Sequence, residues 1–227
     1  MKFFIENKQI DGIIKEIKGK IYLSMNGDVA ESMAQHGLVY KKNFGVNIPR
    51  IREISRDYEP NHDLSARLWA MKIRETMILA TLLQPTEKFT KSDAESWMKS
   101  VSQTELAEQV SMNLFSKLPF AAELSLDLIK SHEMWHQIVG FMTSARISNL
   151  FSQEQIEQII ERAVELSDTE ELHLYKSISL ALSRFCRLGK EIVDKVLGKT
   201  DDFADSEMIS KKYIYSEIKN EVDFMNF

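Results

Sequence analysis

Cysteine, proline and glycine are scarce in this chain of 227 residues. It contains one cysteine, four prolines and eight glycines. A single cysteine excludes an internal disulfide and a cysteine-rich metal site. The four prolines all fall at or before Pro119, so none interrupts the later part of the chain. The sequence also lacks a Gly-rich phosphate loop and a nucleophile elbow, which removes the commonest motifs of nucleotide-binding and hydrolase folds.

Long apolar runs are absent as well. Met1-Lys2-Phe3-Phe4-Ile5 is too short for a signal peptide, and no later run approaches the length of a membrane-spanning helix. With 44% hydrophobic and 28% charged residues, the composition is that of a folded globular chain. We therefore expect a cytoplasmic, monomeric protein without a membrane segment.

Charge is unevenly distributed along the chain. The net charge is −5, and residues 201–227 hold seven acidic against three basic side chains, so the tail carries most of the excess. Residues 41–56 have the opposite character, because five Lys and Arg residues face only one Glu there. A local basic patch on a nearly neutral body is what this distribution predicts.

What is present is helical periodicity. Apolar residues from Leu64 to Leu82 recur at three- and four-residue steps, which predicts one long amphipathic helix over residues 63–82. Asn47 followed by Pro49 predicts a helix that starts near Ile48. Further helices are expected over residues 9–23, 28–38 and 205–222, the first two separated by the turn pair Asn26-Gly27.

Helix start signals recur through the middle of the chain. Four segments have the form of a capping box. In this motif the hydroxyl of the first residue accepts a backbone N–H, and the side chain three residues later accepts the backbone N–H of the first residue. They are Thr90-x-x-Asp93, Ser102-x-x-Glu105, Ser152-x-x-Gln155 and Ser167-x-x-Glu170. Without alternating strand patterns between them, these signals predict an all-α fold of about twelve helices in a single domain over residues 1–227.

Two stretches resemble a known family. Asn43-Phe44-Gly45-Val46-Asn47-Ile48-Pro49-x-Ile51-Arg52, followed by Leu64-x-x-x-Leu68-Trp69-x-x-x-Ile73-x-Glu75, is similar to the opening of the DNA alkylation repair enzymes, the AlkD-like DNA glycosylases. The resemblance continues weakly to about Arg184. It implies a HEAT-like helical-repeat solenoid, an α-α superhelix with a concave groove, and a partner that is duplex DNA, alkylated or not.

The resemblance also points to a catalytic residue. The segment from Trp97 to Glu108 matches a family motif whose final carboxylate is catalytic, which places Glu108 at that carboxylate and Thr104 where the family has a Trp near the lesion. Cleavage of an N-glycosidic bond builds positive charge on the sugar, and a nearby anion stabilises it. The alternative interpretation of Glu108 is an acid on a helix face near the helix start.

Two further family positions are altered. The resemblance implies an Arg three residues after Trp135, which would grip the DNA backbone, but Ile138 stands there. It also implies a second groove Trp where this chain has Leu180. These departures predict weaker packing beside a base.

Basic residues supply the expected DNA contacts. A basic loop before a helix N-terminus can hold a phosphate, and Arg146 and Arg184 are further candidates. The full set is Lys41, Lys42, Arg50, Arg52, Arg146 and Arg184.

No metal or cofactor is expected. His132 and His136 are four residues apart on one helix face, but their apolar neighbours Met134 and Trp135 favour packing over ligation. Cys186 lies among apolar residues and is expected to be a small buried side chain.

Three functions stay open at this point. The first is a glycosylase that excises N3- or N7-alkylated purines with Glu108. The second is a relative that binds DNA without cutting it. The third is a HEAT-repeat scaffold whose groove takes a protein partner.

Overall fold

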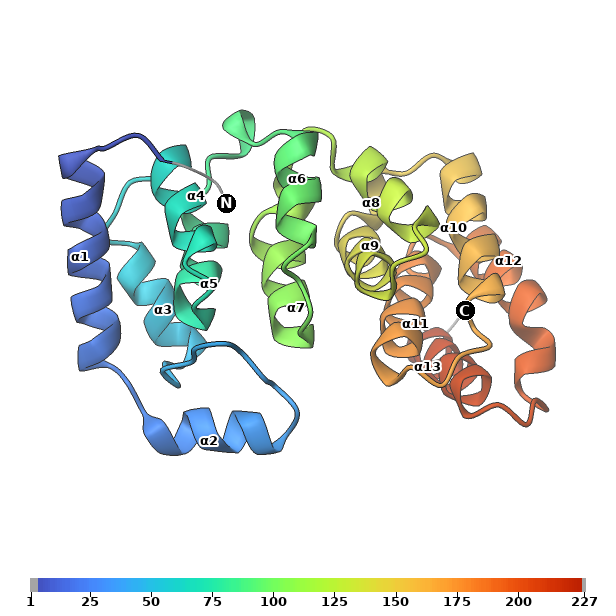
Figure 1. Ribbon diagram of the computed structural model, residues 1–227. Helices are drawn as coiled ribbons and strands as arrows, with labels where there is room; N and C mark the ends of the chain where they lie inside the picture. The colour runs from blue at the N-terminus through green and yellow to red at the C-terminus, as the bar shows by residue number, and fades with distance from the viewer. Residues whose placement is uncertain (1–3, 226–227) are drawn as a thin grey trace. The chain divides into compact units, whose positions relative to one another are not determined.

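The computed structural model describes residues 4–225 (Figure 1). Residues 1–3, which begin the short apolar run discussed above, and residues 226–227 lie outside it. Over the described residues the chain forms α-helices, short 3-10 turns and loops, and no strand. The all-α prediction is therefore confirmed.

The chain divides into two compact units, unit 1 (Met1–Pro119) and unit 2 (Phe120–Phe227). Thirteen α-helices lie within residues 4–225, one more than the sequence led us to expect. Those of unit 1 are α1 (Lys8–Leu23), α2 (Gly27–Gln35), α3 (Ile48–Ser55), α4 (His62–Ala70), α5 (Arg74–Leu83), α6 (Lys91–Met98) and α7 (Thr104–Asn113). Those of unit 2 are α8 (Ala121–Lys130), α9 (Met134–Arg146), α10 (Gln153–Glu165), α11 (Leu172–Cys186), α12 (Lys190–Thr200) and α13 (Ile209–Met225).

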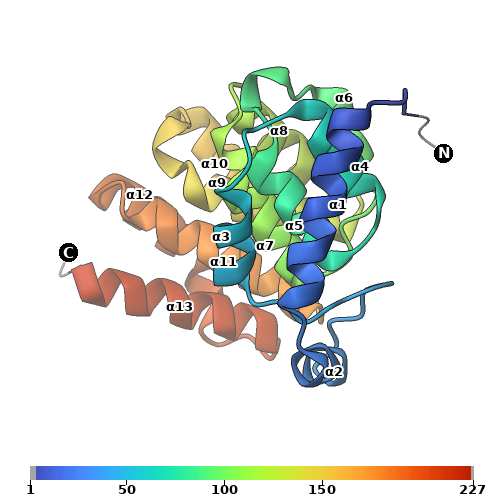
Figure 2. The same cartoon turned by 90° about the vertical axis from the view of Figure 1, so that its left-hand side faces the viewer.

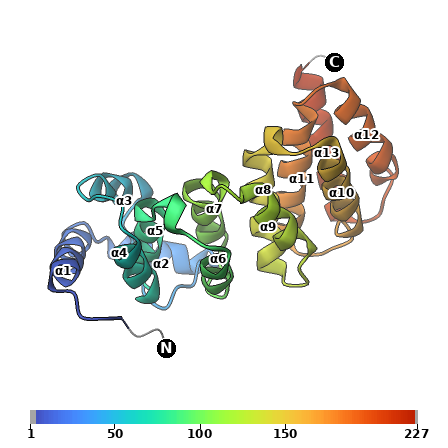
Figure 3. The same cartoon turned by 90° about the horizontal axis from the view of Figure 1, so that it is seen from above.

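Unit 1 is built of two helix layers. Helices α3, α5 and α7 pack side by side in one layer, while α1, α4 and α6 form the other (Figure 3). Trp69 of α4 stacks on Trp97 of α6 with ring centroids 4.0 Å apart, and both rings are buried. Helix α2 lies across the end of these layers, where it has no buried residue (Figures 1 and 2).

Unit 2 repeats the arrangement. Helices α9, α11 and α13 pack against one another in one layer, and α8, α10 and α12 contact in the other. Phe141, Phe185 and Ile214 are fully buried between them. Cys186 is also buried, as predicted, and burial raises the pKa of its thiol to about 12. The succession of stacked helix pairs in each unit is a helical-repeat fold, as predicted.

The predicted long helix over residues 63–82 is wrong. The chain breaks at Met71–Ile73 into α4 and α5, which pack against each other. Lys72 adopts a φ of 56°, a left-handed conformation that cannot continue a helix. Because α4 and α5 both bury apolar faces, the three- and four-residue spacing of apolar residues continues through the turn between them. The sequence pattern therefore does not reveal the break.

Other boundaries differ in smaller ways. The predicted helix over 28–38 ends at Gln35, and the one over 205–222 begins at Ile209. The capping boxes at Thr90 and at Ser152 are present. Those at Ser102 and Ser167 are not, because α7 begins after Gln103 and α11 begins after Glu171.

None of the helices in residues 4–225 has both the length and the apolar character needed to cross a membrane. Within the same residues, no group of three or more His, Cys, Asp or Glu side chains is placed to hold a metal ion. His132 is exposed, and burial lowers the pKa of His136, so that the neutral ring is favoured.

Candidate functional site

A buried ion-pair network lies where α5 and α7 begin. Arg74 and Glu75, the first residues of α5, are 2% and 0% exposed. The Arg74 guanidinium donates to both oxygens of Glu105 in α7, at 2.7 and 2.6 Å, in a bidentate pair. Its third nitrogen donates to Glu75 at 2.9 Å. The charges at the starts of the two helices are therefore paired with one another.

This network also fastens the loop that precedes α3. The Glu75 carboxylate accepts the backbone N–H groups of Phe44 and Val46, at 3.1 and 3.3 Å. Arg74 donates to the Val46 carbonyl at 2.7 Å, and the Tyr40 hydroxyl donates to Glu105 at 3.0 Å. A buried Glu whose lone pairs are used by backbone donors holds those donors in place. Residues 39–46 are thereby fixed against the starts of α5 and α7.

The pKa shifts in the network agree with this geometry. Burial and then the Glu105 carboxylate raise the pKa of Tyr40, which keeps its hydroxyl a proton donor. Burial alone would lower the pKa of Arg74, but the Glu105 and Glu75 carboxylates hold it above the ordinary value. Each charge is thus balanced where it lies, which a buried ion pair requires.

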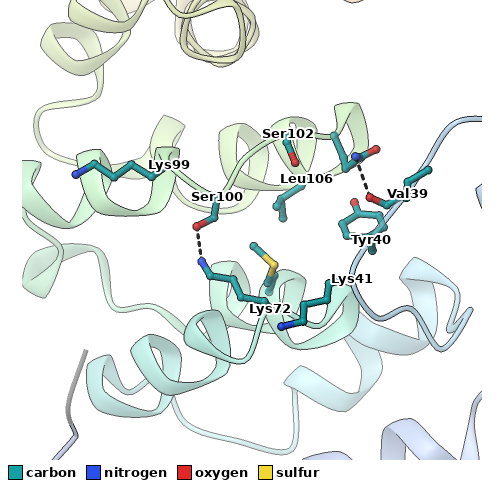
Figure 4. A pocket seen from close by; sticks show the side chains of 10 residues that line it. Val39, Tyr40, Lys41, Lys72, Lys99, Ser100, Ser102 and Leu106 are labelled. Atoms are coloured by element: carbon teal, nitrogen blue, oxygen red, sulfur yellow. Dashed lines mark hydrogen bonds between the residues drawn. The ribbon is translucent and has the colours of Figure 1, made fainter. Parts of the chain in front are cut away.

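A pocket opens beside this network, entirely within unit 1 (Figure 4). Its volume is about 320 Å³, at the small end of the range for ligand sites. Three lysines line it, each from a different loop: Lys41 before α3, Lys72 before α5 and Lys99 before α7. Among the described residues, the ten that line the pocket include no Asp or Glu. The pocket is therefore strongly cationic.

Lys72 is the lysine that the fold constrains most. Its backbone is left-handed, its side chain is half-buried, and its ammonium donates to the Ser100 hydroxyl (Figure 4). The ammonium also lies 5.6 Å from the centre of the Trp69 ring. Burial lowers the pKa of Lys72. Burial therefore disfavours the charged form of Lys72, and a nearby anion would favour it.

Lys41 is the only member of the predicted basic loop among the residues that line this pocket. Lys42, its neighbour, is exposed and lies over the Phe44 ring at 4.9 Å. Arg50 donates to the Ser24 hydroxyl at 3.0 Å and forms an ion pair with Glu53 at 2.7 Å on the surface. The predicted patch is therefore divided between a pocket and the flank of α3.

Arg52 points toward α7. Its guanidinium contacts the Met112 sulfur of α7 at 3.6 Å. Met112 lies one helical turn after Glu108, and Thr104 lies one turn before it, so all three share one face of α7. The Glu108 side chain is exposed. The structure therefore places a basic residue of α3 beside the face that carries the predicted catalytic acid.

The remaining candidates lie in unit 2. Arg146 is exposed and donates to the Met142 carbonyl of its own helix at 2.9 Å. Arg184 is half-buried in the last turn of α11. Leu180 lies one turn earlier in α11 and is also half-buried, whereas Ile138 is 0% exposed within α9. An Arg at position 138 would be buried in the core, so that position offers no backbone contact.

The two units differ in charge. Residues 1–119 carry 17 Lys and Arg against 15 Asp and Glu, a net charge of +2. Residues 120–227 carry 12 against 19, a net charge of −7. An anionic partner is attracted to the first set and repelled by the second.

Lys72 and Lys99 were not predicted as site residues from the sequence. Lys72 stood in the middle of a predicted helix, and Lys99 is one of many surface lysines near a helix end. The available signal was the pair Lys99-Ser100 between two start motifs, a basic loop of the same kind as Lys41-Lys42. The fact that these loops meet depends on how the helix pairs stack.

The comparisons with known proteins agree with the fold. The model of the DNA alkylation repair enzyme family matches residues 22–207. A solved structure aligns with a TM-score of 0.76 and 15% sequence identity. The alignment covers 91% of this chain and 94% of the chain in that structure. It is described as one of a new family of proteins related to the HEAT-like repeat DNA glycosylases, with affinity for branched DNA structures. No curated protein sequence matches the chain. On the match over residues 22–207, the chain belongs to the DNA alkylation repair enzyme family.

Proposed function

We propose that the protein binds duplex DNA, alkylated or branched, through the basic loops of unit 1. The observation that carries this proposal is a pocket lined by Lys41, Lys72 and Lys99, from three different loops, with no carboxylate in its lining among the described residues. Phosphate contacts from lysines and loop N–H groups position a protein on DNA without reading its sequence. Membership of the alkylation repair family and the positive charge of unit 1 support the same partner.

The finer proposal is base excision by Glu108. Its carboxylate lies on an exposed face of α7, with Arg52 one turn away at Met112. In that position an arginine could hold a DNA phosphate while the carboxylate stabilises positive charge on the sugar of an N3- or N7-alkylated purine. No aromatic ring stands at Thr104, one turn before it.

Binding without excision is the second candidate. Thr104 and Leu180 stand where family resemblance implies rings that flank the lesion, and the side chain at Ile138 is buried. A relative with affinity for branched DNA favours this candidate as well. A protein partner for the helical surface is the remaining alternative.

Binding is tested with duplexes closed by a hairpin at both ends, so that no strand terminus is present. Contacts to about four phosphates should make log K fall with log salt at a slope of about −3.6. The triple variant K41A/K42A/K99A removes three exposed lysines of the basic loops. It should leave about one phosphate contact and so reduce the slope to about −0.9. K130A/K190A/K199A, three exposed lysines of unit 2, is the matched control and should keep the wild-type slope. A flat salt dependence in the wild type would exclude DNA and favour a protein partner.

Excision is tested by release of 7-methylguanine under single-turnover conditions, against a protein-free control. If Glu108 stabilises the sugar cation, E108Q should lower the rate by about 10²- to 10³-fold while duplex affinity stays the same. E95Q, an exposed acid of α6, is the control and should have no effect. Release by the wild type no faster than the protein-free rate would leave DNA binding without excision as the function.

A further inference from the structure

The pocket of unit 1 holds more positive charge than a backbone phosphate needs. A phosphodiester in a strand carries one negative charge, and a terminal phosphate monoester carries about −1.5 to −2 at pH 7 and offers three acceptor oxygens. Three lysines from three loops line a hollow of about 320 Å³. We propose that this pocket binds the terminal phosphate monoester of a DNA strand end. The proposal rests on the proposed function in one respect, that DNA supplies the phosphate.

The polar groups around the lysines suit such a ligand. Ser100 accepts a hydrogen bond from Lys72 and retains its own O–H as a donor. Ser102 is exposed at the pocket and provides a second hydroxyl. Gln103 is already used, since its side-chain amide donates to the Val39 carbonyl at 3.0 Å and holds the wall that Val39 and Tyr40 form. The lining thus offers ammonium and hydroxyl donors from walls that are tied together.

The carboxylates of the neighbouring ion-pair network do not compete for the lysines. Glu105 lies behind the Tyr40 wall, where both of its oxygens accept from Arg74 and one also accepts from Tyr40. Glu75 is occupied by Arg74 and by backbone N–H groups of the loop. Because these acids are held by their own partners, the charge of the lysines is available to a bound anion.

Lys72 gives the site its asymmetry. A left-handed backbone at a lysine is strained relative to the ordinary conformation, and strain of this kind is often found where function requires a side chain in a particular place. Here it places the ammonium of a half-buried side chain at the pocket, one hydrogen bond from Ser100. Lys41 and Lys99 are exposed at the rim. A phosphate would therefore meet one half-buried cation and two exposed ones.

The experiment compares duplexes of one sequence that differ only at their ends. One carries a 5′ phosphate, one a 3′ phosphate and one hydroxyls alone, and affinity is measured by fluorescence anisotropy at matched ionic strength. A charge-assisted contact of the kind proposed should strengthen binding of one phosphorylated duplex by about tenfold or more over the hydroxyl duplex. Inorganic phosphate should compete with that duplex more strongly than chloride at equal ionic strength. The two phosphorylated duplexes tell which strand end fits.

Two variants isolate the pocket. K72M removes the ammonium and keeps the length of the side chain, and K72N removes it with a residue that tolerates the left-handed backbone. Both should bind all three duplexes equally, and a thermal melt of K72N confirms that the fold is retained. K88M is the matched control, since Lys88 is an exposed lysine of unit 1 that does not line the pocket, and it should keep the preference for a phosphate end.

The outcomes separate this inference from the proposed function. Equal binding of all three duplexes by the wild type, with a salt slope intact, overturns the inference and leaves DNA binding standing. Binding of inorganic phosphate or a mononucleotide in a Lys72-dependent way, without binding of any duplex, supports the monoester pocket and overturns the DNA proposal. A phosphate preference that persists in both K72M and K72N shows that another part of the surface holds the strand end, and it also overturns the inference.

Discussion

At the scale of single residues, Lys72 combines two unfavourable contributions to the free energy of folding. Its backbone is left-handed, and burial of its side chain disfavours the charged form. Neither cost is needed to form the turn between α4 and α5, because Gly or Asn would make that turn with less strain. The position therefore suits a residue kept for its ammonium group.

The lowered pKa of Lys72 predicts a pH dependence of binding. As pH rises through the lowered pKa, Lys72 loses its proton before an ordinary lysine with a pKa of 10.5 would. The affinity for a phosphate-terminated duplex should then fall between that lowered pKa and 10.5, and stay level below it. In K72R the guanidinium stays charged, so affinity should persist through this window.

Anisotropy titrations at fixed ionic strength from pH about 7.5 to 10.5 measure this dependence. The Lys72 ammonium contacts the Ser100 hydroxyl and the Trp69 ring, and Lys41 and Lys99 line the same pocket, so the substituted Arg has the same neighbours. Parallel pH curves for the wild type and K72R would show that Lys72 does not titrate in this range.

Single positions also mark how far sequence reasoning reached. Cys186 was identified as a buried side chain because it lies among apolar residues, and it is buried. Arg50 and Arg52 were read as DNA contacts from charge alone, but a side chain's partners are set by neighbours distant in sequence. Ser24 and Met112 lie 26 and 60 residues away. No local pattern contains that information.

At the scale of elements, the loop between α2 and α3 depends on Gly45. Its φ is +69°, and a Cβ placed there would lie 2.0 Å from the Asn26 carbonyl oxygen and 2.8 Å from the Ala30 nitrogen. Those atoms belong to the N-terminal end of α2, and Asn26 itself donates a backbone hydrogen bond to Phe44 at 2.8 Å. The close approach lets α2 and the loop that carries Lys41 support each other.

G45A should therefore destabilise unit 1 and move this loop. The strained backbone and the clash together should lower the free energy of unfolding by about 2 kcal/mol or more, and preference for a phosphate end should weaken because Lys41 is displaced. Urea unfolding and anisotropy measure the two effects. G19A is the control, because Gly19 lies inside α1 with no atom within 4 Å of an added Cβ. It should be neutral or stabilise by up to about 1 kcal/mol. Stability of G45A equal to that of the wild type would contradict this account of the loop.

Helix starts were predictable where the cap is local. The boxes at Thr90 and Ser152 form because each hydroxyl and its third residue bond to each other's backbone N–H within the first turn. At Ser102 the box fails because Glu105 is taken by Arg74 and Tyr40, which lie 31 and 65 residues away. The element existed where expected, but its first residue was decided by a tertiary contact.

At the scale of the whole molecule, the helical-repeat fold was predictable from periodicity, and the meeting of loops was not. Stacking of the helix pairs brings the three lysine loops of unit 1 to one pocket. Because the repeats are degenerate, no sequence motif shows how the helix pairs stack. The predicted single domain over residues 1–227, with its groove, stays a prediction. The difference of +2 against −7 between the units leads us to expect that DNA approaches from unit 1.

The single-domain prediction can be tested because the tryptophans are divided between the units. Trp69 and Trp97 lie in unit 1, and Trp135 lies in unit 2, so W135F confines the tryptophan signal to unit 1. G140A should destabilise unit 2, since an added Cβ in α9 would lie 2.7 Å from the Ile129 side chain and 2.8 Å from its backbone nitrogen in α8. The chain passes from the turn at Phe115–Lys117 to α8 at Ala121 without a Gly- or Ser-rich linker. We therefore expect helix pairs that fold as one cooperative array.

Urea unfolding of W135F and W135F/G140A, followed by circular dichroism and by tryptophan fluorescence, decides between one domain and two. Circular dichroism reports all helices, and fluorescence reports unit 1 alone. In a cooperative array the G140A change should move both midpoints together, because the loss in unit 2 is shared by the whole transition. If the units unfold separately, the fluorescence midpoint should stay at that of W135F, while circular dichroism should show a second, earlier step. That result would divide residues 1–227 into two domains and confine the binding experiments above to the first.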